Sequence, residues 1–189
     1  MATGRGNLVS SATLAIFVAG FVFVASQSGF AQEKKKVSWS VKPENSKSTF
    51  RQRFEIPDIP GHAIVMEEYR RTWPNGGAPV VEGRKVVEEI AWGMADGVAG
   101  NGFQRGYRVW RFENGDQSFA EWSLAFQSLI NPDRSRKVTF VGTYVETGGT
   151  GTLKGIKGVG RFSGVTDFNP ELKPTRNEYS AEGEYWFEK

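Results

Sequence analysis

The stretch TGGTGTLKGIKGVGRFSG, residues 147–164, lies between two segments near the C-terminus that alternate like β-strands. Glycine at this density is unfavourable in a helix or an ordinary strand, so each glycine is expected at a turn, a bulge or a close approach of two backbones. We interpret the stretch as a tight connection followed by a sharply bent, small-residue strand at the corner of a β-barrel. This structural role is assigned to Gly148, Gly149, Gly151, Gly155 and Gly158.

The same stretch lacks the features of known glycine-rich ligand sites. Residues 149–157 are echoed by residues 158–166, but calcium-binding nine-residue repeats need an aspartate in each copy and neither copy has one. A phosphate-binding P-loop ends in Gly-Lys-Ser/Thr, which is missing here, and the third glycine comes one residue late for the dinucleotide motif G-x-G-x-x-G. The glycines therefore predict a fold and no reaction.

Outside this stretch, many segments show the period of two that is typical of half-buried strands. In residues 50–56, Phe50 and Phe54 alternate with Arg51 and Arg53. Further strands are expected at 62–73, 80–92, 137–146 and 179–187, with a helix as the alternative for 80–92, and loops are expected at 96–102 and 165–176.

The clearest expected hairpin is centred on Asn114-Gly115, because this pair favours a two-residue type I′ turn. In that register Tyr107 faces Trp122 on an apolar side, and Trp110 lies on the opposite, outer side, where either a covering element or a subunit contact would explain it. About eight strand-like segments with short turns predict an all-β chain. We expect an eight-stranded antiparallel β-barrel, with a two-sheet β-sandwich as the alternative.

The N-terminus has the order of a secretory signal peptide, residues 1–31. Arg5 precedes an apolar run, and the small residues Gly29 and Ala31 come before the expected cut. An uncleaved membrane anchor is the alternative, because the run approaches the length of a spanning helix. We expect a secreted or periplasmic protein with no membrane contact after cleavage, a polar leader at 32–45 and one β-barrel domain at 46–189. A first edge strand is the alternative for residues 37–45.

The composition excludes several kinds of chemistry. The chain has no cysteine and a single histidine, His62, so disulfides, thiolate metal sites and histidine-rich metal sites are all excluded. After removal of residues 1–31, 23 Lys and Arg stand against 21 Asp and Glu, which is no electrostatic footprint for nucleic acid. We expect no metal and no cofactor.

The glycine-rich stretch, followed by a last aromatic strand, resembles the matching region of the allene oxide cyclase barrel and dirigent-like superfamily. The resemblance is strongest over residues 135–189. It implies an eight-stranded antiparallel barrel with a hydrophobic central cavity, assembled as a dimer or trimer. In that superfamily the glycine motif is structural, so the resemblance carries over no catalytic residue.

In a barrel of this size, the inward positions form both the core and any ligand cavity. The side chains expected to line the cavity are Phe54, Tyr69, Tyr107, Trp122, Phe126 and Phe140. Adjacent carboxylates point to opposite faces of a strand, so one acid of Glu67-Glu68 and one of Glu88-Glu89 can point inward; the candidates are Glu67, Glu68 and Glu88. Arginines are plentiful, which favours a structural ion-pair network over a general acid or base.

Two functions follow from this arrangement. The first is a barrel that binds a small, mostly apolar ligand or serves as a structural module. The alternative is a cofactor-free isomerase or cyclase acting on a hydrophobic substrate, with an inward glutamate and an arginine stabilising charge. A purely oligomeric scaffold, with Trp110 and Phe119 at the subunit contact, is a third interpretation.

Overall fold

The computed structural model describes residues 32–188, which form ten strands and two short 3-10 helices, with no α-helix in that range. The elements are β1 (Lys35–Val41), η1 (Pro43–Asn45), β2 (Ser46–Glu55), β3 (His62–Arg71), β4 (Val80–Val81), β5 (Arg84–Val98), β6 (Asn101–Phe112), β7 (Gln117–Ile130), β8 (Arg136–Gly149), η2 (Gly151–Leu153), β9 (Ile156–Phe168) and β10 (Pro174–Phe187). The prediction of an all-β chain is confirmed. The expected signal peptide, residues 1–31, lies outside the described residues.

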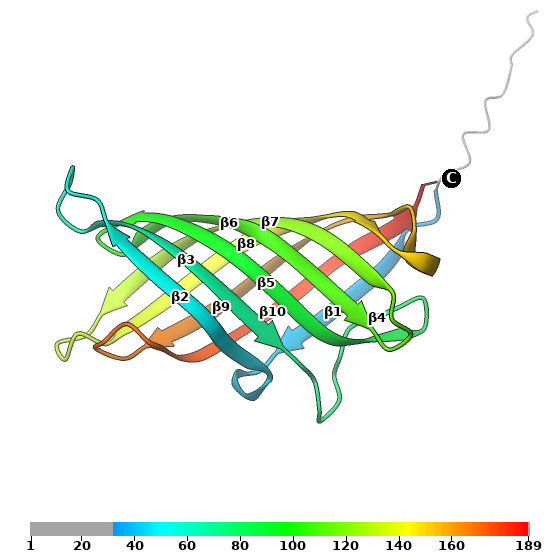
Figure 1. Ribbon diagram of the computed structural model, residues 1–189, viewed down its shortest axis with the longest axis horizontal. Coiled ribbons are helices and arrows are strands. Elements are labelled where there is room, and N and C mark those ends of the chain that lie inside the picture. The colour runs from blue at the N-terminus through cyan, green and yellow to red at the C-terminus, as the bar shows by residue number, and fades with distance from the viewer. Residues whose placement is uncertain (1–31, 189) are drawn as a thin grey trace, which may run out of the picture. The chain divides into compact units, whose positions relative to one another are not determined.

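The strands form one antiparallel sheet in the order β1-β10-β9-β8-β7-β6-β5-β3-β2, and β4 pairs only with β5 (Figure 1). The predicted count of eight strands is therefore wrong. The end strands β1 and β2 are not paired with each other, so the hydrogen-bond ladder is not closed into a barrel. The alternative of two packed sheets is not observed either, because the ladder is continuous from β1 to β2.

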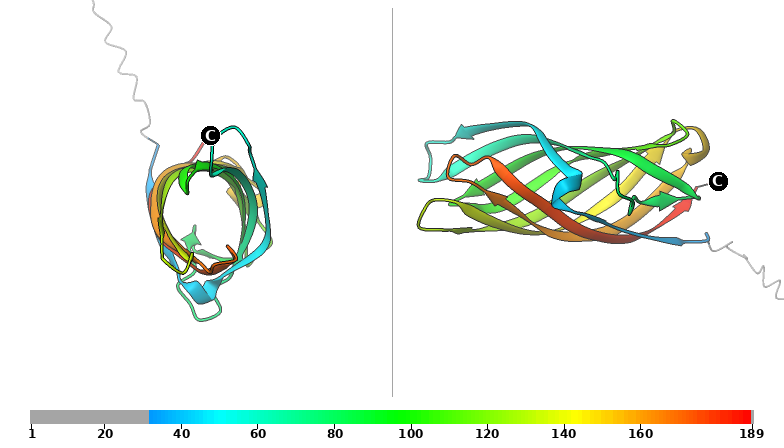
Figure 2. Two further views of the ribbon diagram at one scale, coloured as in Figure 1. Left: turned by 90° about the vertical axis from the view of Figure 1, so that its left-hand side faces the viewer. Right: turned by 90° about the horizontal axis from the view of Figure 1, so that it is seen from below.

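The sheet curls strongly, so that one of its faces turns inward (Figure 2). Side chains from all nine strands of the main path line a single cavity, which is the direct evidence for this curl. Beyond the last residue pair of β1 with β10, Val41–Tyr179, the Ser46 hydroxyl of β2 donates to the Asn177 side-chain oxygen of β10 at 3.0 Å.

One end of the rolled sheet is filled by a hydrophobic core. Trp110 and Phe112 at the end of β6 pack with Leu153 of η2 and with Trp39 of β1. The rings of Trp39 and Trp110 meet edge to face, with centroids 4.7 Å apart, and Leu153 is completely buried. This core closes the end of the sheet that carries the β6–β7 and β8–β9 connections. The cavity therefore opens toward the other end.

The glycine-rich stretch is only in part the bent corner that the sequence predicts. Gly148 and Gly149 end β8, Gly151 begins η2, and Gly155 lies in the following turn; among these, Gly151 and Gly155 have positive φ. From Gly158 onward the chain is regular strand, because β9 pairs with β8 without a register shift. The expected sharp bend is therefore wrong.

Inward glycines instead make room for aromatic rings from neighbouring strands. Trp122 of β7 pairs with Gly106 of β6, which pairs with Gly93 of β5. A Cβ on either glycine would overlap the Trp122 ring. Gly160 of β9 makes the same room for the Tyr144 ring. The rings therefore lie against bare backbone, and this leaves space in the middle of the roll.

The β6–β7 hairpin forms, but its predicted register is wrong by one residue. The loop has three residues, since the Phe112 amide donates to the Asp116 carbonyl at 2.9 Å. Gly115 has positive φ and Asn114 does not, so the turn is not type I′. Tyr107 therefore pairs with Glu121 and faces outward, whereas Trp110 faces inward and is 1 % exposed. The expected subunit contact at Trp110 is excluded.

Other connections are shorter than predicted. The expected loop at 96–102 is the two-residue turn Ala99-Gly100, and the expected loop at 165–176 shrinks to residues 169–173. The segment 80–92 is strand, split into β4 and the start of β5, so the helix alternative is wrong. In the expected leader, residues 35–41 form β1 and pair with β10 along their whole length.

Candidate functional site

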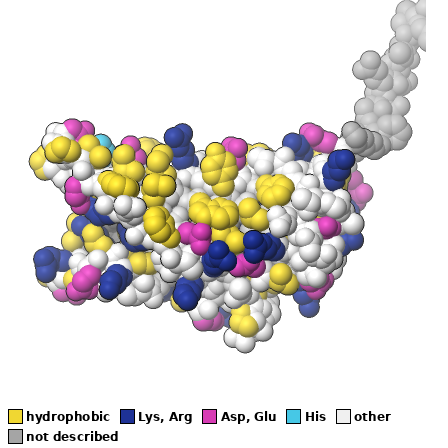
Figure 3. All heavy atoms as spheres, in the orientation of Figure 1, with side chains coloured by type: hydrophobic (Ala, Val, Ile, Leu, Met, Phe, Trp, Pro, Cys, Tyr) yellow, Lys and Arg dark blue, Asp and Glu magenta, His cyan; other side chains and the backbone are white. Residues whose placement is uncertain are grey.

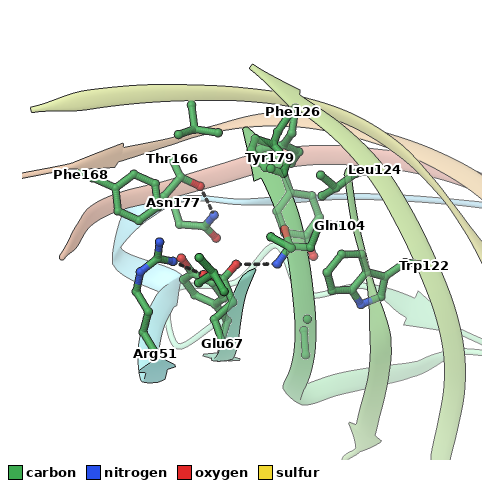
Figure 4. Close-up of a pocket in the computed structure, with 18 of the residues that line it drawn as sticks. Arg51, Glu67, Gln104, Trp122, Leu124, Phe126, Thr166, Phe168, Asn177 and Tyr179 are labelled. Atoms are coloured by element: carbon green, nitrogen blue, oxygen red, sulfur yellow. Dashed lines mark hydrogen bonds and ion pairs between the residues drawn. The ribbon is translucent and has the colours of Figure 1, made fainter. Parts of the chain in front are cut away.

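The inward face of the sheet surrounds a cavity of about 170 Å³ (Figure 4). Of the six side chains expected to line it, Tyr69, Trp122, Phe126 and Phe140 do so. Phe54 and Tyr107 do not: they lie on the outer face and are 43 % and 63 % exposed. Tyr107 is displaced by the register of the β6–β7 hairpin. In β2 the alternation is inverted, so that Arg51 and Arg53 line the cavity and the phenylalanines face outward.

Among the three candidate carboxylates, only Glu67 lines the cavity. One of its oxygens accepts from Gln104 of β6 at 2.7 Å, and the other accepts from Arg51 of β2 at 2.5 Å, as Figure 4 shows. The Arg51 guanidinium also lies over the Phe168 ring, 4.7 Å from its centroid. Both oxygens of Glu67 are therefore held by donors.

Glu68 and Glu88 are positioned outside the cavity. The Glu68 carboxylate accepts from Thr49 at 2.6 Å and from the Trp92 indole at 2.7 Å, and these hydrogen bonds, Thr49 first, lower its pKa. Glu88 is paired with Arg70 and Arg111. Both carboxylates belong to charge networks on the outer surface.

The inward acid of the Glu88-Glu89 pair is Glu89, which forms the floor of the cavity. It is 1 % exposed and accepts from Arg71 at 2.5 Å, from the Trp110 indole at 2.7 Å and from the Tyr179 hydroxyl at 3.0 Å. Burial alone would raise the pKa of Glu89, but the positive charges of Arg71 and Arg108 outweigh this and lower it. Glu89 is therefore an ionised, fully hydrogen-bonded carboxylate.

A second buried ion pair lies beside this floor. Arg108 donates to Glu146, and its guanidinium stacks on the Trp110 ring, 3.7 Å from the centroid. Burial raises the pKa of Glu146, and the charge of Arg108 opposes that shift only in part. Burial likewise raises the pKa of Tyr144, whose hydroxyl has no hydrogen-bond partner among the described residues, to about 12.

Asn177 joins the floor to the wall. Its side-chain oxygen accepts from Arg71 at 3.1 Å, and its nitrogen donates to Thr166 at 2.9 Å. The residues of the floor therefore hold one another in place, although the buried Nε atoms of Arg71 and Arg108 and one oxygen of Glu146 have no hydrogen-bond partner among the described residues.

The mouth of the cavity carries three arginines, Arg51, Arg53 and Arg136. Arg51 is paired with Glu67, and Arg53 is paired with Glu55 at 2.5 Å. Arg136, the first residue of β8, forms no ion pair among the described residues, and its buried Nε has no hydrogen-bond partner there. Burial, followed by repulsion from Arg53, lowers the pKa of Arg136.

Sequence reasoning missed Arg136 and Gln104 as cavity residues. Arg136 comes just after a turn and before an alternating strand, so its face could have been read from Val138 and Phe140, which lie two and four residues later and also line the cavity. Gln104 lies on β6, where the shifted hairpin register reversed the predicted faces.

Within residues 32–188, no group of three or more His, Asp or Glu side chains is placed to hold a metal ion. In the same range, no helix is long and apolar enough to cross a membrane.

Comparison with protein-family models, with curated proteins and with solved structures finds no significant match to this chain. The resemblance to the allene oxide cyclase barrel and dirigent-like superfamily therefore rests only on the sequence of residues 135–189, and it stays a prediction.

Proposed function

We propose that this protein binds a small, mostly apolar molecule in the cavity of its rolled sheet, in a secreted or periplasmic setting. In this proposal the sheet acts as an incompletely closed β-barrel. The observation that carries it is the aromatic wall of Trp122, Phe126, Phe140 and Phe162, which surrounds open space although the opposite end of the roll is tightly filled.

The architecture of the wall supports this proposal. A sheet whose interior served only stability would fill its inward positions with large side chains. Here the successive inward positions of β5 that line the cavity carry only small residues: Ala91, Gly93, Ala95 and Gly97. The cavity is smaller than the ~300–1,000 Å³ of typical drug-sized sites. About 150 Å³ suffices for benzene in an engineered core, so a single ring fits.

A cavity-filling substitution tests the proposal. Toluene is titrated into isotope-labelled protein, and chemical-shift changes are followed by NMR for the wild type, Ala95→Phe and Met94→Phe. Ala95 lines the cavity, whereas Met94 lies next to it on the outer face of the same strand. We expect saturable binding to the wild type and to M94F, and loss of binding in A95F. Equal binding by A95F, or none by the wild type, contradicts the proposal.

The natural ligand is sought separately. Native mass spectrometry of protein purified from its own host is expected to show a co-purifying small molecule, which A95F should lack.

A cofactor-free isomerase or cyclase remains the second candidate, and it is favoured by the presence of Glu67 beside Arg51 in the cavity wall. It has less support, because both Glu67 oxygens are engaged by Gln104 and Arg51. For an enzyme, Glu67→Gln should abolish turnover of the co-purified compound while leaving its binding intact. If the compound is not turned over by the wild type, this candidate fails.

A further inference from the structure

We propose that the ligand is an arylalkyl carboxylate: a single aromatic ring occupies the cavity, and a carboxylate on its short alkyl chain is bound by Arg136 at the mouth. This inference rests on the proposed function and specifies the chemistry of the ligand.

The charges of the side chains at the mouth do not balance. The cavity wall there carries three guanidinium groups, and the carboxylates beside them are Glu67 and Glu55. Glu67 is committed to Arg51 and Gln104, and both oxygens of Glu55 accept from Arg53, at 2.5 and 3.2 Å. One positive charge, on Arg136, is left over. A ligand with a single negative charge would neutralise Arg136, and this favours a carboxylate over a phosphate dianion.

The surroundings of Arg136 leave its side chain without a complete set of partners. Its Nε is buried and without a partner, although a buried polar group without a hydrogen bond is costly. Its Nη1 lies over the β5–β6 turn, 3.7 Å from where a Cβ on Gly100 would be. The pKa of Arg136 is lowered by burial and by Arg53 and Arg51, and Glu55 offsets this only in part. The positive charge is therefore less well stabilised there than in water, and an anion would stabilise it.

Arg136 is continuous with the aromatic wall of the cavity. On β8, Arg136, Val138 and Phe140 occupy successive inward positions and all line the cavity. A ring bound between Trp122, Phe126 and Phe140 would therefore lie on the same inward row of β8 as the Arg136 guanidinium. Only Val138 lies between Phe140 and Arg136 in that row. Arginine binds carboxylates through two parallel N–H donors, which fixes the orientation of such a ligand.

Matched probes test the inference. The affinities of 3-phenylpropionate and 3-phenylpropionamide are measured by isothermal titration calorimetry for the wild type, Arg136→Gln and Arg161→Gln. The two probes share ring and length and differ in charge. Arg161 is the control, because it lies on the outer face of β9, 78 % exposed and paired with Glu182.

We expect the wild type and R161Q to bind the acid about tenfold more tightly than the amide, as a charged hydrogen bond implies. R136Q should lose this preference while binding the amide as before, and Arg136→Lys should retain part of it. If the amide binds as tightly as the acid, or if R136Q keeps the preference, the inference is wrong while the cavity proposal stands. If neither probe nor toluene binds, both fail.

Discussion

The glycine positions on the inner face of the sheet are set by the aromatic rings opposite them. Gly106 lies beneath the Trp122 ring and beside the Trp92 carbonyl, so an added Cβ has no room there. Gly148, at the end of β8, has no heavy atom within 4 Å of an added Cβ.

Gly106→Ala is therefore expected to lower the free energy of unfolding by about 1–3 kcal/mol through overpacking. Gly148→Ala is expected to leave it nearly unchanged. Urea denaturation measures both unfolding free energies. The dependence of the unfolding free energy on urea concentration should be the same for the two variants and the wild type. If G106A is as stable as the wild type, the ring does not lie against the backbone of β6.

His62 begins β3 and bridges two carboxylates, Asp58 of the preceding turn at 2.6 Å and Asp96 of β5 at 2.9 Å. These hydrogen bonds, that of Asp58 first, raise the pKa of His62. A raised folded-state pKa means that this contribution to stability is fully present below the unfolded value, about 6.5, and is lost as the pH rises through the folded value.

NMR titration of the imidazole is expected to give a pKa above 6.5 in the wild type and a lower value in Asp96→Asn. Asp133→Asn serves as the control, because Asp133 interacts with Ser135 in a different turn. A His62 pKa that is unchanged by D96N would contradict the bridge.

At the scale of the element, β1 is part of the core. Trp39 packs against Trp110 and Tyr144, and Val41 is buried beside it. The composition of residues 32–45 is polar and lysine-rich, and this hides the alternation of the few inward residues of β1.

Trp39→Ala should cost about 3–5 kcal/mol of unfolding free energy, as for other buried aromatic residues. Lys36→Ala, which changes an exposed residue of the same strand, should cost almost nothing. Thermal and urea unfolding both report the difference. Equal stability of the two variants would mean that residues 35–41 are a leader after all.

The hairpins show which parts of the fold could be predicted from the sequence. The strands around Asn114-Gly115 were found, but positive φ at both turn residues occurs instead at Glu82-Gly83 and Ala99-Gly100. Asn-Gly is the stronger local signal for such a turn. In the β6–β7 hairpin the burial of Arg108 and Trp110 overrides it, because a one-residue shift exchanges the faces of the whole strand.

The chemical type of the inward residues on each strand explains which site residues could be predicted. On β7 and β8 the inward residues are apolar, so Trp122, Phe126 and Phe140 were identified from alternation alone. On β2 the inward residues at the mouth are arginines, while the outer face carries Phe50 and Phe54. A rule that places hydrophobic residues inside assigns such a strand the wrong way round.

At the scale of the whole molecule, the outer face of the sheet carries a considerable hydrophobic surface (Figure 3). Phe103, Ala125 and Val141 lie side by side on β6, β7 and β8, and Phe103 is 74 % exposed. Hydrophobic patches of this kind mark interaction surfaces. The dimer or trimer that the superfamily resemblance implies stays a prediction.

A double substitution, Phe103→Ser with Tyr107→Ser, is expected to shift the protein from oligomer to monomer in light-scattering measurements. Ser123→Ala, on the outer face of β7, is the control and should not change the mass. A wild-type protein that is monomeric at all concentrations would contradict this prediction.

The central claim is that the rolled sheet encloses a binding cavity, and intermolecular nuclear Overhauser effects test it most directly. With bound 3-phenylpropionate or toluene, we expect contacts from the ring protons to the side chains of Trp122, Phe126 and Phe140. Contacts confined to the exposed Phe103 and Tyr107 would place the ligand on the outer face and contradict the account.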